Sequence, residues 1–338
     1  MAKTIPLIRA ANLLPLVRWT EANRHRSELY LAKTDLDYWY ALSPMDPIPL
    51  RSGIDYLRML ARDHGPDIGV RIVNQASVAE IGFIGAVALG ARNPVEAFQR
   101  LSFAMPLHSS HETFRVGVEG DQLLISHALN FQIDDESLHA VHVLLISMLQ
   151  QVLRFTGQQP PLLRKVEMMA HPQVGLSHIS TGFSDRLFPS ESGMLTVSID
   201  LSVAQVPYQA VARDRSANPY LKQIPPLTEN HGLAASVRPV IAAMLHGGEP
   251  TIERIALTYG GSVRSLQRRL SEEGTSFSEQ LDLVRRELVM SHLDGQEDAS
   301  LSELSERLGY SGQSALTRAV RRLTGQTPSQ LASERGLQ

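Results

Sequence analysis

The sequence predicts two structural parts: an α+β domain with helices and a small antiparallel sheet, followed by an all-α domain with two helix-turn-helix units. Three observations support this prediction. The length of 338 residues exceeds the ~100–200 residues of one typical domain. Residues 1–220 mix helical and extended patterns, whereas residues 233–338 contain an internal repeat of helical segments. Between them, residues 221–232 (LKQIPPLTENHG) contain two prolines and little apolar periodicity, which is typical of a linker.

The composition indicates a soluble, packed protein, since 43% of the residues are hydrophobic and 20% are charged. The absence of cysteine excludes a disulfide framework, a thiol nucleophile and a cysteine-ligated metal site. Arg9, Pro15 and Arg18 interrupt the apolar residues near the start, unlike in a signal peptide. The longest apolar run, residues 81–89, is far shorter than the ~20 residues of a membrane span and predicts a core helix instead. We therefore expect a cytoplasmic protein without a membrane partner.

The first 220 residues predict helices and strands in an order typical of an α+β domain. Asn93 followed by Pro94 is a helix-start signal, and Glu119-Gly120-Asp121 is a hairpin turn between two extended stretches. The predicted elements are a helix over 51–65, a helix from Pro94, a hairpin of 114–118 with 122–129, an amphipathic helix over 134–155, and extended stretches at 163–169 and 194–201.

The C-terminal part contains the same pattern twice. Residues 255–270 align with residues 304–320 when one residue is inserted in the second turn. The alignment pairs Ile255 with Leu304, Ala256 with Ser305, Gly260 with Gly309, Leu266 with Leu316, and Arg268 with Arg318. A duplicated unit of this length predicts two copies of one supersecondary motif.

Each copy has the features of a helix-turn-helix. Ile252, Ile255, Ala256 and Tyr259 follow helical spacing and predict one buried face of a short helix. Gly260 and Gly309 are the residues that can end the first helix of each copy in a left-handed conformation. Ser262 is a natural N-cap for the next helix, and Ser300 with Glu303 forms a capping box in the second copy.

The charges separate between the helices, although residues 249–338 carry 11 Arg against 13 acidic residues. The second helices, predicted over 262–270 and 311–323, each contain three arginines and no acid. Their apolar residues Val263, Leu266 and Leu270, or Leu316, Val320 and Leu323, are expected to face the core. The side chains expected to face outward and to read base edges are Arg264, Gln267, Arg268, Gln313, Ser314, Thr317 and Arg318. Contacts to phosphates are expected from Ser262, Arg269, Arg321 and Arg322.

A helical stripe of Phe277, Leu281, Val284, Leu288 and His292 predicts a helix over 277–293 that joins the two units. A helix of these 17 residues is about 25 Å long at ~1.5 Å per residue. A rigid spacer of this length can hold two recognition helices near the ~34 Å separation of successive major-groove faces. One chain could therefore read two neighbouring grooves.

These features make residues 233–338 resemble the DNA-binding domain of the AraC/XylS family of bacterial transcription regulators. The stretches LQRRLSEEGTSFSEQLDLVRRELVMSHL and LSELSERLGYSGQSALTRAVRRLTGQTPSQL carry the resemblance. It implies base contacts at the seven outward-facing residues named above. The chain departs from the family pattern at Leu316, Val320 and Leu323, where aromatic residues are usual.

The first ~220 residues resemble, less specifically, the arabinose-binding-type N-terminal domain of one branch of this family, through IPLRSGIDYLRML and IGFIGAVALGARNPVEAFQRLSFAM. The resemblance implies a regulator, expected to be an activator, that responds to a small organic effector. The expected partners are double-stranded DNA, this effector, RNA polymerase and a second copy of the chain.

The histidines leave an alternative function open: a DNA-tethered enzyme or a metal-dependent sensor in the N-terminal half. His108 with His111, and His139 with His142, are pairs three residues apart that could begin a metal site. The sequence contains no HExxH motif, phosphate-binding loop or dinucleotide-binding glycine motif. We therefore expect no catalytic residue, no bound metal and no cofactor.

Overall fold

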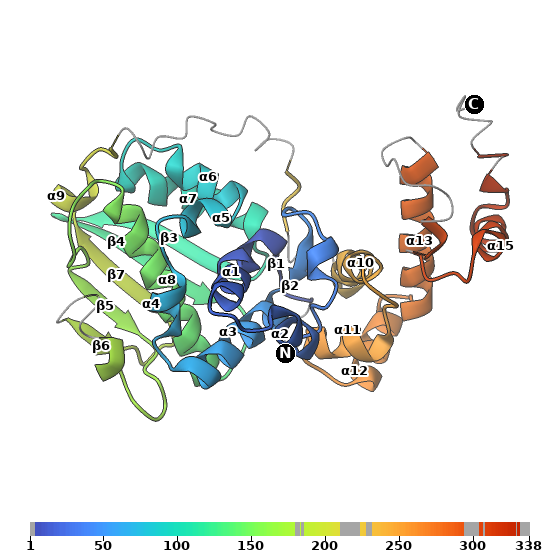
Figure 1. Cartoon of the computed structure of the whole chain (residues 1–338), viewed down its shortest axis with the longest axis horizontal. Helices are drawn as coiled ribbons and strands as arrows, with labels where there is room; N and C mark the ends of the chain where they lie inside the picture. Colours follow the sequence, from blue (N-terminus) through green and yellow to red (C-terminus); the bar gives the residue numbers. More distant parts are fainter. Residues whose placement is uncertain are drawn as a thin grey trace.

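The computed structural model describes residues 4–179, 183, 186–209, 224–227, 232–293, 304–306, 308–328 and 330–331. Figure 1 shows a mixed α/β N-terminal part beside a C-terminal part made of helices. This arrangement confirms the predicted fold class, α+β followed by all-α.

The larger sheet has five strands in the order β3-β4-β7-β5-β6. Their bounds are Glu112–Glu119 (β3), Gln122–Leu129 (β4), Lys165–Met168 (β5), Leu187–Pro189 (β6) and Leu195–Asp200 (β7). The predicted hairpin is confirmed, because β3 and β4 pair antiparallel with Glu119 opposite Gln122. The sequence predicted an antiparallel sheet. The structure differs at one pair, because β5 pairs with β6 in parallel.

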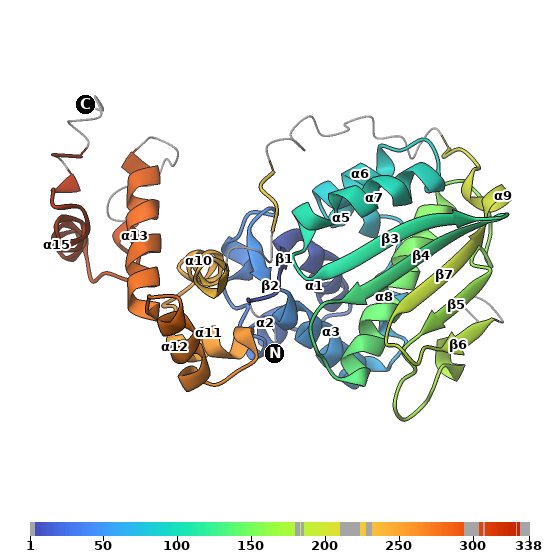
Figure 2. The same cartoon turned by 180° about the vertical axis from the view of Figure 1, so that it is seen from behind.

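Two long helices, α7 (Pro94–His108) and α8 (Asp135–Arg154), pack with this sheet. The cap at Asn93 was predicted from the sequence and is confirmed, and the structure shows a second cap, Asp134, at the start of α8. The Asn93 side chain accepts a hydrogen bond from the Glu96 amide at 3.0 Å, and the Asp134 side chain accepts one from the Ser137 amide at 2.9 Å. Figures 1 and 2, from opposite sides, place α8 on one face of the sheet and α7 beside the edge strand β3.

The rest of the N-terminal part is mainly helical and surrounds a two-stranded sheet. Its elements are β1 (Leu7–Arg9), η1 (Ala10–Leu13), α1 (Leu14–Ala22), α2 (Ser27–Lys33), η2 (Trp39–Ala41), β2 (Pro47–Pro49), α3 (Leu50–His64), α4 (Ile68–Ile72), α5 (Ser77–Glu80), α6 (Phe83–Leu89), η3 (Ser177–Ile179) and α9 (Leu201–Ala204). The predicted core helix of residues 81–89 forms as α6, whose Phe83 and Ile84 are buried.

The C-terminal part comprises α10 (Gly232–Met244), α11 (Ile252–Tyr259), α12 (Val263–Glu272), α13 (Phe277–Leu293) and α15 (Gln313–Thr324). The turn between α11 and α12 is as predicted, because Gly260 is left-handed with φ 75° and Ser262 caps α12 through the Ser265 amide. The predicted connecting helix is confirmed as α13.

The bounds of the two recognition helices differ from the prediction. Helix α12 continues past Leu270 to Glu272, so it contains an acid. Helix α15 begins at Gln313 rather than at Ser311, and it ends at Thr324, one residue beyond the predicted end. The predicted capping box of Ser300 and Glu303 and the side chain of Leu323 lie outside the described residues.

The two parts share one hydrophobic core. Helix α10 packs against β2, and its Leu233, Val237 and Ile241 belong to the same buried cluster as Leu31 and Ile48. The Ser236 hydroxyl accepts a hydrogen bond from the Ile5 amide at 2.9 Å. The start of the C-terminal part is therefore held directly on the N-terminal part. Among the described residues, no helix is long and apolar enough to cross a membrane.

Candidate DNA-binding surface and ligand cavity

Helix α12 presents its predicted base-reading residues to solvent. Leu266 and Leu270 are buried and attach the helix to the rest of the unit. The opposite side exposes Arg264, Gln267 and Arg268, and the Arg268 side chain is 71% exposed. These three lie in a shallow surface depression together with Ser262, Ser265 and Ser271. This face combines forked cationic donors with hydroxyl and amide groups, which is the chemistry used to contact base edges and phosphates.

The predicted phosphate-contacting residues near α12 have partners in this structure. The Ser262 hydroxyl accepts the amide of Ser265 at 3.2 Å. The Arg269 guanidinium lies 3.4 Å from Glu272, and Arg268 lies 3.5 Å from the same carboxylate. Because the side chains of Arg268 and Arg269 are 71% and 39% exposed, these ion pairs are weak and a phosphate can replace them.

Helix α15 repeats this arrangement. Leu316 and Val320 are both 1% exposed, so the two described residues that depart from the aromatic family pattern still fill the core. Gln313, Ser314, Arg318 and Arg321 are exposed and Thr317 is half-buried. The predicted phosphate residue Arg322 donates to both carboxylate oxygens of Asp282 on α13, at 2.8 and 2.9 Å. In Figure 1, α12 lies near the start of α13 and α15 packs beside α13 further along.

The N-terminal part contains a cavity of about 160 Å³. It lies between η1 and α1, the segment from β2 to α3, helices α5 to α7, strands β3 and β4, and helix α8. Most of its lining is aliphatic, including Ile8, Ile48, Leu101, Leu144 and Met148. Its polar lining side chains are Asn12, His108, Glu112 and His127.

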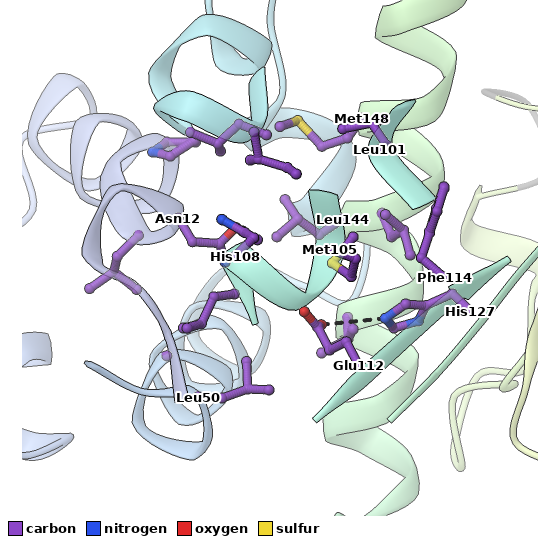
Figure 3. Close-up of a pocket in the computed structure, with 18 of the residues that line it drawn as sticks. Asn12, Leu50, Leu101, Met105, His108, Glu112, Phe114, His127, Leu144 and Met148 are labelled. Atoms are coloured by element: carbon purple, nitrogen blue, oxygen red, sulfur yellow. Dashed lines mark hydrogen bonds and ion pairs between the residues drawn. The ribbon is translucent and has the colours of Figure 1, made fainter. Parts of the chain in front are cut away.

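The polar side chains form two pairs (Figure 3). His127 Nε2 lies 3.3 Å from Glu112 Oε1, and His108 Nε2 lies 3.3 Å from Asn12 Oδ1. The other ring nitrogen of each histidine, Nδ1, is buried without a partner among the described residues. Buried polar atoms are normally hydrogen-bonded, so these two nitrogens are exceptions within the described part of the chain.

Burial and pairing set the charges around the cavity. Burial lowers the pKa of His108 to about 4, so this imidazole is neutral near pH 7. Burial also acts to raise the pKa of Glu112, but the hydrogen bond and charge of His127 outweigh it, and the pKa of Glu112 lies below its ordinary value. Glu112 is therefore an ionised carboxylate beside an apolar space.

The sequence indicated only one of these polar residues, His108, and assigned it to a pair with His111. The two rings separate in the structure: His108 faces the cavity, and His111 Nε2 lies 3.1 Å from the Thr4 hydroxyl. Asn12, Glu112 and His127 come from different elements and were not singled out. No local spacing could have revealed them, because the fold alone brings them together.

The second histidine pair is also divided between different partners. His139 Nδ1 lies 2.8 Å from the Met169 carbonyl oxygen and its Nε2 lies 3.0 Å from His178 Nε2. His142 Nδ1 accepts the Met169 amide at 3.0 Å. In the described ranges, no group of three His, Asp or Glu side chains is arranged to hold a metal ion.

The first helix-turn-helix unit contacts the N-terminal part through Arg254 of α11. Its guanidinium bonds to Asp35 and Asp37 and lies 5.7 Å from the centre of the Tyr38 ring. Close by, the backbone of Gly247 approaches Tyr38 so tightly that an added Cβ would lie 2.5 Å from the Tyr38 Cβ. The cavity-bearing part and the first helix-turn-helix unit are therefore in direct contact.

Comparisons with known proteins agree with this division. Residues 255–334 match the family model described as a helix-turn-helix domain, and residues 29–187 match the arabinose-binding domain of AraC transcription regulators. The transcriptional regulator VirS of Mycobacterium tuberculosis is 26% identical over 285 residues, 80% of each chain. The ornithine utilization regulator of Pseudomonas aeruginosa is 36% identical over 103 residues, and that match spans only 30% of its length.

A crystal structure of the transcriptional regulator CdpR from Pseudomonas aeruginosa aligns with 94% of this chain and 98% of its own, at 20% identity and a TM-score of 0.38. The two family models place a helix-turn-helix in the C-terminal part and an AraC-type domain in the N-terminal part. The chain belongs to the AraC family of DNA-binding transcription regulators and carries the N-terminal effector-binding domain of that family.

Proposed function

We propose that this regulator activates transcription in the bacterial cytoplasm when a small organic molecule occupies the cavity of its N-terminal part. DNA binding uses base contacts from Arg264, Gln267, Arg268, Gln313, Ser314, Thr317 and Arg318, and phosphate contacts from Ser262, Arg269, Arg321 and Arg322. One observation carries this proposal: α12 attaches by buried Leu266 and Leu270, α15 attaches by buried Leu316 and Val320, and both helices expose arginines on the other side. Phosphate neutralisation by these arginines makes DNA binding strongly dependent on salt.

In this proposal, residues 1–220 form the effector domain, 221–232 the linker and 233–338 the DNA-binding domain. The two-stranded sheet connects the cavity with the DNA-binding part. Ile8 of β1 and Ile48 of β2 line the cavity, while α10 packs against β2. A ligand that prefers one arrangement of β1 and β2 shifts the population of the whole chain toward it, by its difference in affinity for the two states.

Buried Arg9 adds a second connection between the cavity region and the linker. Its guanidinium donates to the carbonyl oxygens of Leu107 at 3.0 Å, Met45 at 2.7 Å and Pro225 at 2.6 Å. These three acceptors lie at the end of α7, in the segment before β2 and in the proposed linker. Movement of α7 around a ligand is thereby transmitted to the segment that precedes α10.

The proposed macromolecular partners are RNA polymerase and a second copy of the chain. Strand β3 is an edge of the five-stranded sheet, and Phe103 of α7 beside it is 86% exposed, which supports an interface between copies at this edge. Sedimentation analysis of Phe103→Glu tests the dimer. The substituted chain is expected to be monomeric at concentrations where the wild type is dimeric, and a wild-type monomer at all concentrations would contradict the proposal.

Genome-wide mapping of DNA occupancy, combined with transcript measurement in a deletion strain, tests the function. We expect the occupied sites to share one sequence motif and the adjacent genes to lose expression on deletion. Gain of expression would show a repressor, and occupancy without a shared motif would contradict sequence-specific regulation. Chemical analysis of the ligand recovered from the protein should return it unchanged, whereas a converted product would favour the enzymatic alternative.

A further inference from the structure

The polar side chains of the cavity define what kind of molecule fits it, and this inference rests on the cavity being the effector site proposed above. We propose that the effector is an uncharged, mainly apolar alcohol or phenol, whose single hydroxyl lies against Glu112. Its hydrocarbon body lies against the aliphatic lining. In Figure 3, Glu112 and His127 lie on one side of the cavity, and Leu101 and Met148 lie on the opposite side.

The aliphatic lining selects a hydrocarbon body. Among the described residues, only Asn12, His108, Glu112 and His127 contribute polar side chains to the wall. These four already form two pairs, so most hydroxyls of a sugar would find no hydrogen-bond partner. Each buried hydroxyl without a hydrogen bond costs on the order of 1–3 kcal/mol. An apolar cavity of ~150 Å³ takes a molecule about the size of benzene, and the volume here, about 160 Å³, indicates a ligand of similar scale. The ligand proposed here therefore differs in its chemistry from arabinose, the sugar named in the description of the family model.

The charge at the polar side disfavours an anionic ligand. Glu112 is ionised and buried, and none of the described residues that line the cavity is Lys or Arg. The nearby guanidinium of Arg9 is engaged by three backbone carbonyls. A carboxylate placed beside Glu112 would be desolvated and repelled, and no lysine or arginine in the described lining would offset either cost.

A cationic ligand is also disfavoured. Glu112 already has His127 as a hydrogen-bond donor at 3.3 Å, so its charge is partly compensated. An ammonium group would lose its hydration in an apolar space. In return it would gain only the attraction of a carboxylate that is already hydrogen-bonded to His127. A neutral hydroxyl avoids this desolvation cost.

A hydroxyl matches the available partners because it both donates and accepts a hydrogen bond. Ionised Glu112 can only accept, and His127 and Ser109 already donate to it, so a ligand hydroxyl adds a further donor to this set. The proton of that hydroxyl in turn has the carboxylate as its acceptor. A carbonyl or ether oxygen, which only accepts, would place a second acceptor beside the carboxylate with no proton between them.

Titration calorimetry on the full chain at pH 7.5 tests the inference with hexan-1-ol, hexanoate, hexylammonium and arabinose. We expect hexan-1-ol to bind about tenfold or more tightly than each of the other three. Glu112→Gln removes the charge and retains a polar amide, so the ratio of the hexan-1-ol and hexanoate affinities is expected to fall. Gly53→Leu, which fills the cavity, should abolish hexan-1-ol binding.

The outcomes separate this inference from the proposed function. If hexanoate, hexylammonium or arabinose binds as tightly as hexan-1-ol and Gly53→Leu abolishes that binding, the cavity is a ligand site and the alcohol assignment is wrong. If none of the four probes binds, or if Gly53→Leu leaves binding intact, both the alcohol assignment and the cavity as effector site are contradicted. An unchanged affinity ratio in folded Glu112→Gln would also overturn the role given to that carboxylate.

Discussion

Arg254 of the first helix-turn-helix unit lies 3.3 Å, Nε to Oδ1, from Asp35 of the N-terminal part. The same guanidinium bonds to Asp37, and the Arg254 side chain is only 20% exposed. This contact links the helix that precedes the first recognition helix to the part of the chain that holds the cavity. A change around the cavity therefore has a direct route to α11 and α12.

Arg254→Met should uncouple DNA binding from the effector. The substitution keeps much of the side-chain packing and removes the hydrogen bonds to the two carboxylates. The contact between the two parts should lose about 1–3 kcal/mol of free energy. We expect the ratio of DNA dissociation constants with and without effector to fall toward one. Fluorescence anisotropy measures both constants. Arg92→Met is a control, since Arg92 pairs with Glu96 within the N-terminal part, and an effector response in Arg254→Met equal to that of the control would contradict the coupling role.

Gly53→Leu should stabilise the ligand-free protein and remove its response to ligand. Gly53 lines the cavity on α3, and an added Cβ would have only Leu13 Cδ1 near it, at 3.9 Å. The substitution removes the ~1 kcal/mol helix cost of glycine and fills apolar space, so Tm should rise by several degrees. Thermal unfolding with and without ligand measures both effects.

The control Ala32→Leu adds a side chain on the exposed side of α2 and should keep the ligand-induced shift in Tm. Retention of that shift in Gly53→Leu would place the ligand elsewhere.

Arg268→Ala should weaken binding to the cognate site by about 1–3 kcal/mol and relax the preference at one base pair. The Arg268 side chain is 71% exposed, and its ion pair among the described residues is a 3.5 Å contact to Glu272, so it can leave this contact to enter a groove. Competition binding against single-base variants of the site measures both changes. An equal loss on every sequence would assign Arg268 to a phosphate, and Arg92→Ala should change nothing.

Acid should destabilise the fold through its buried histidines. Burial lowers the pKa of His139 to about 4 and that of His142 to about 3, below the ~6.5 of an unfolded histidine. The unfolded chain therefore binds more protons between these values, so stability is full above pH 6.5 and falls as the pH decreases toward 4. Each histidine contributes a slope of up to about 1.4 kcal/mol per pH unit in this window.

His142→Asn isolates one of these contributions. The Asn side-chain oxygen can replace His142 Nδ1 as acceptor for the Met169 amide and does not titrate. We expect urea unfolding between pH 5 and 6.5 to show that the free energy of unfolding depends less steeply on pH in this variant, by the equivalent of about one bound proton. A slope unaffected by His142→Asn would show that this imidazole does not set the acid sensitivity.

Local sequence signals predicted the features that depend on local chemistry. Asn93 caps the helix that it was expected to start, and Gly260 adopts the left-handed turn. Leu266 and Leu270 fixed which side of α12 would be exposed. These features follow from backbone geometry and helical periodicity within a few residues.

The sequence could not predict features that depend on distant segments meeting. Asn12 and His108 are neighbours only because η1 and α7 pack together. The two prolines after Ile224 suggested separate parts, yet Val237 of α10 lies in a core shared with the N-terminal part. Tertiary packing decides these contacts, and no spacing along the chain encodes them.

Selection of binding sites from a random pool of double-stranded DNA, with the full chain at physiological salt, tests the central claim most directly. Two recognition helices joined by α13 predict an enriched site with two short motifs about one helical turn apart, ~10 base pairs. The enriched site should bind at least about 1,000-fold more tightly than a scrambled one. Enrichment of no sequence, or equal binding of both DNAs, would contradict the account.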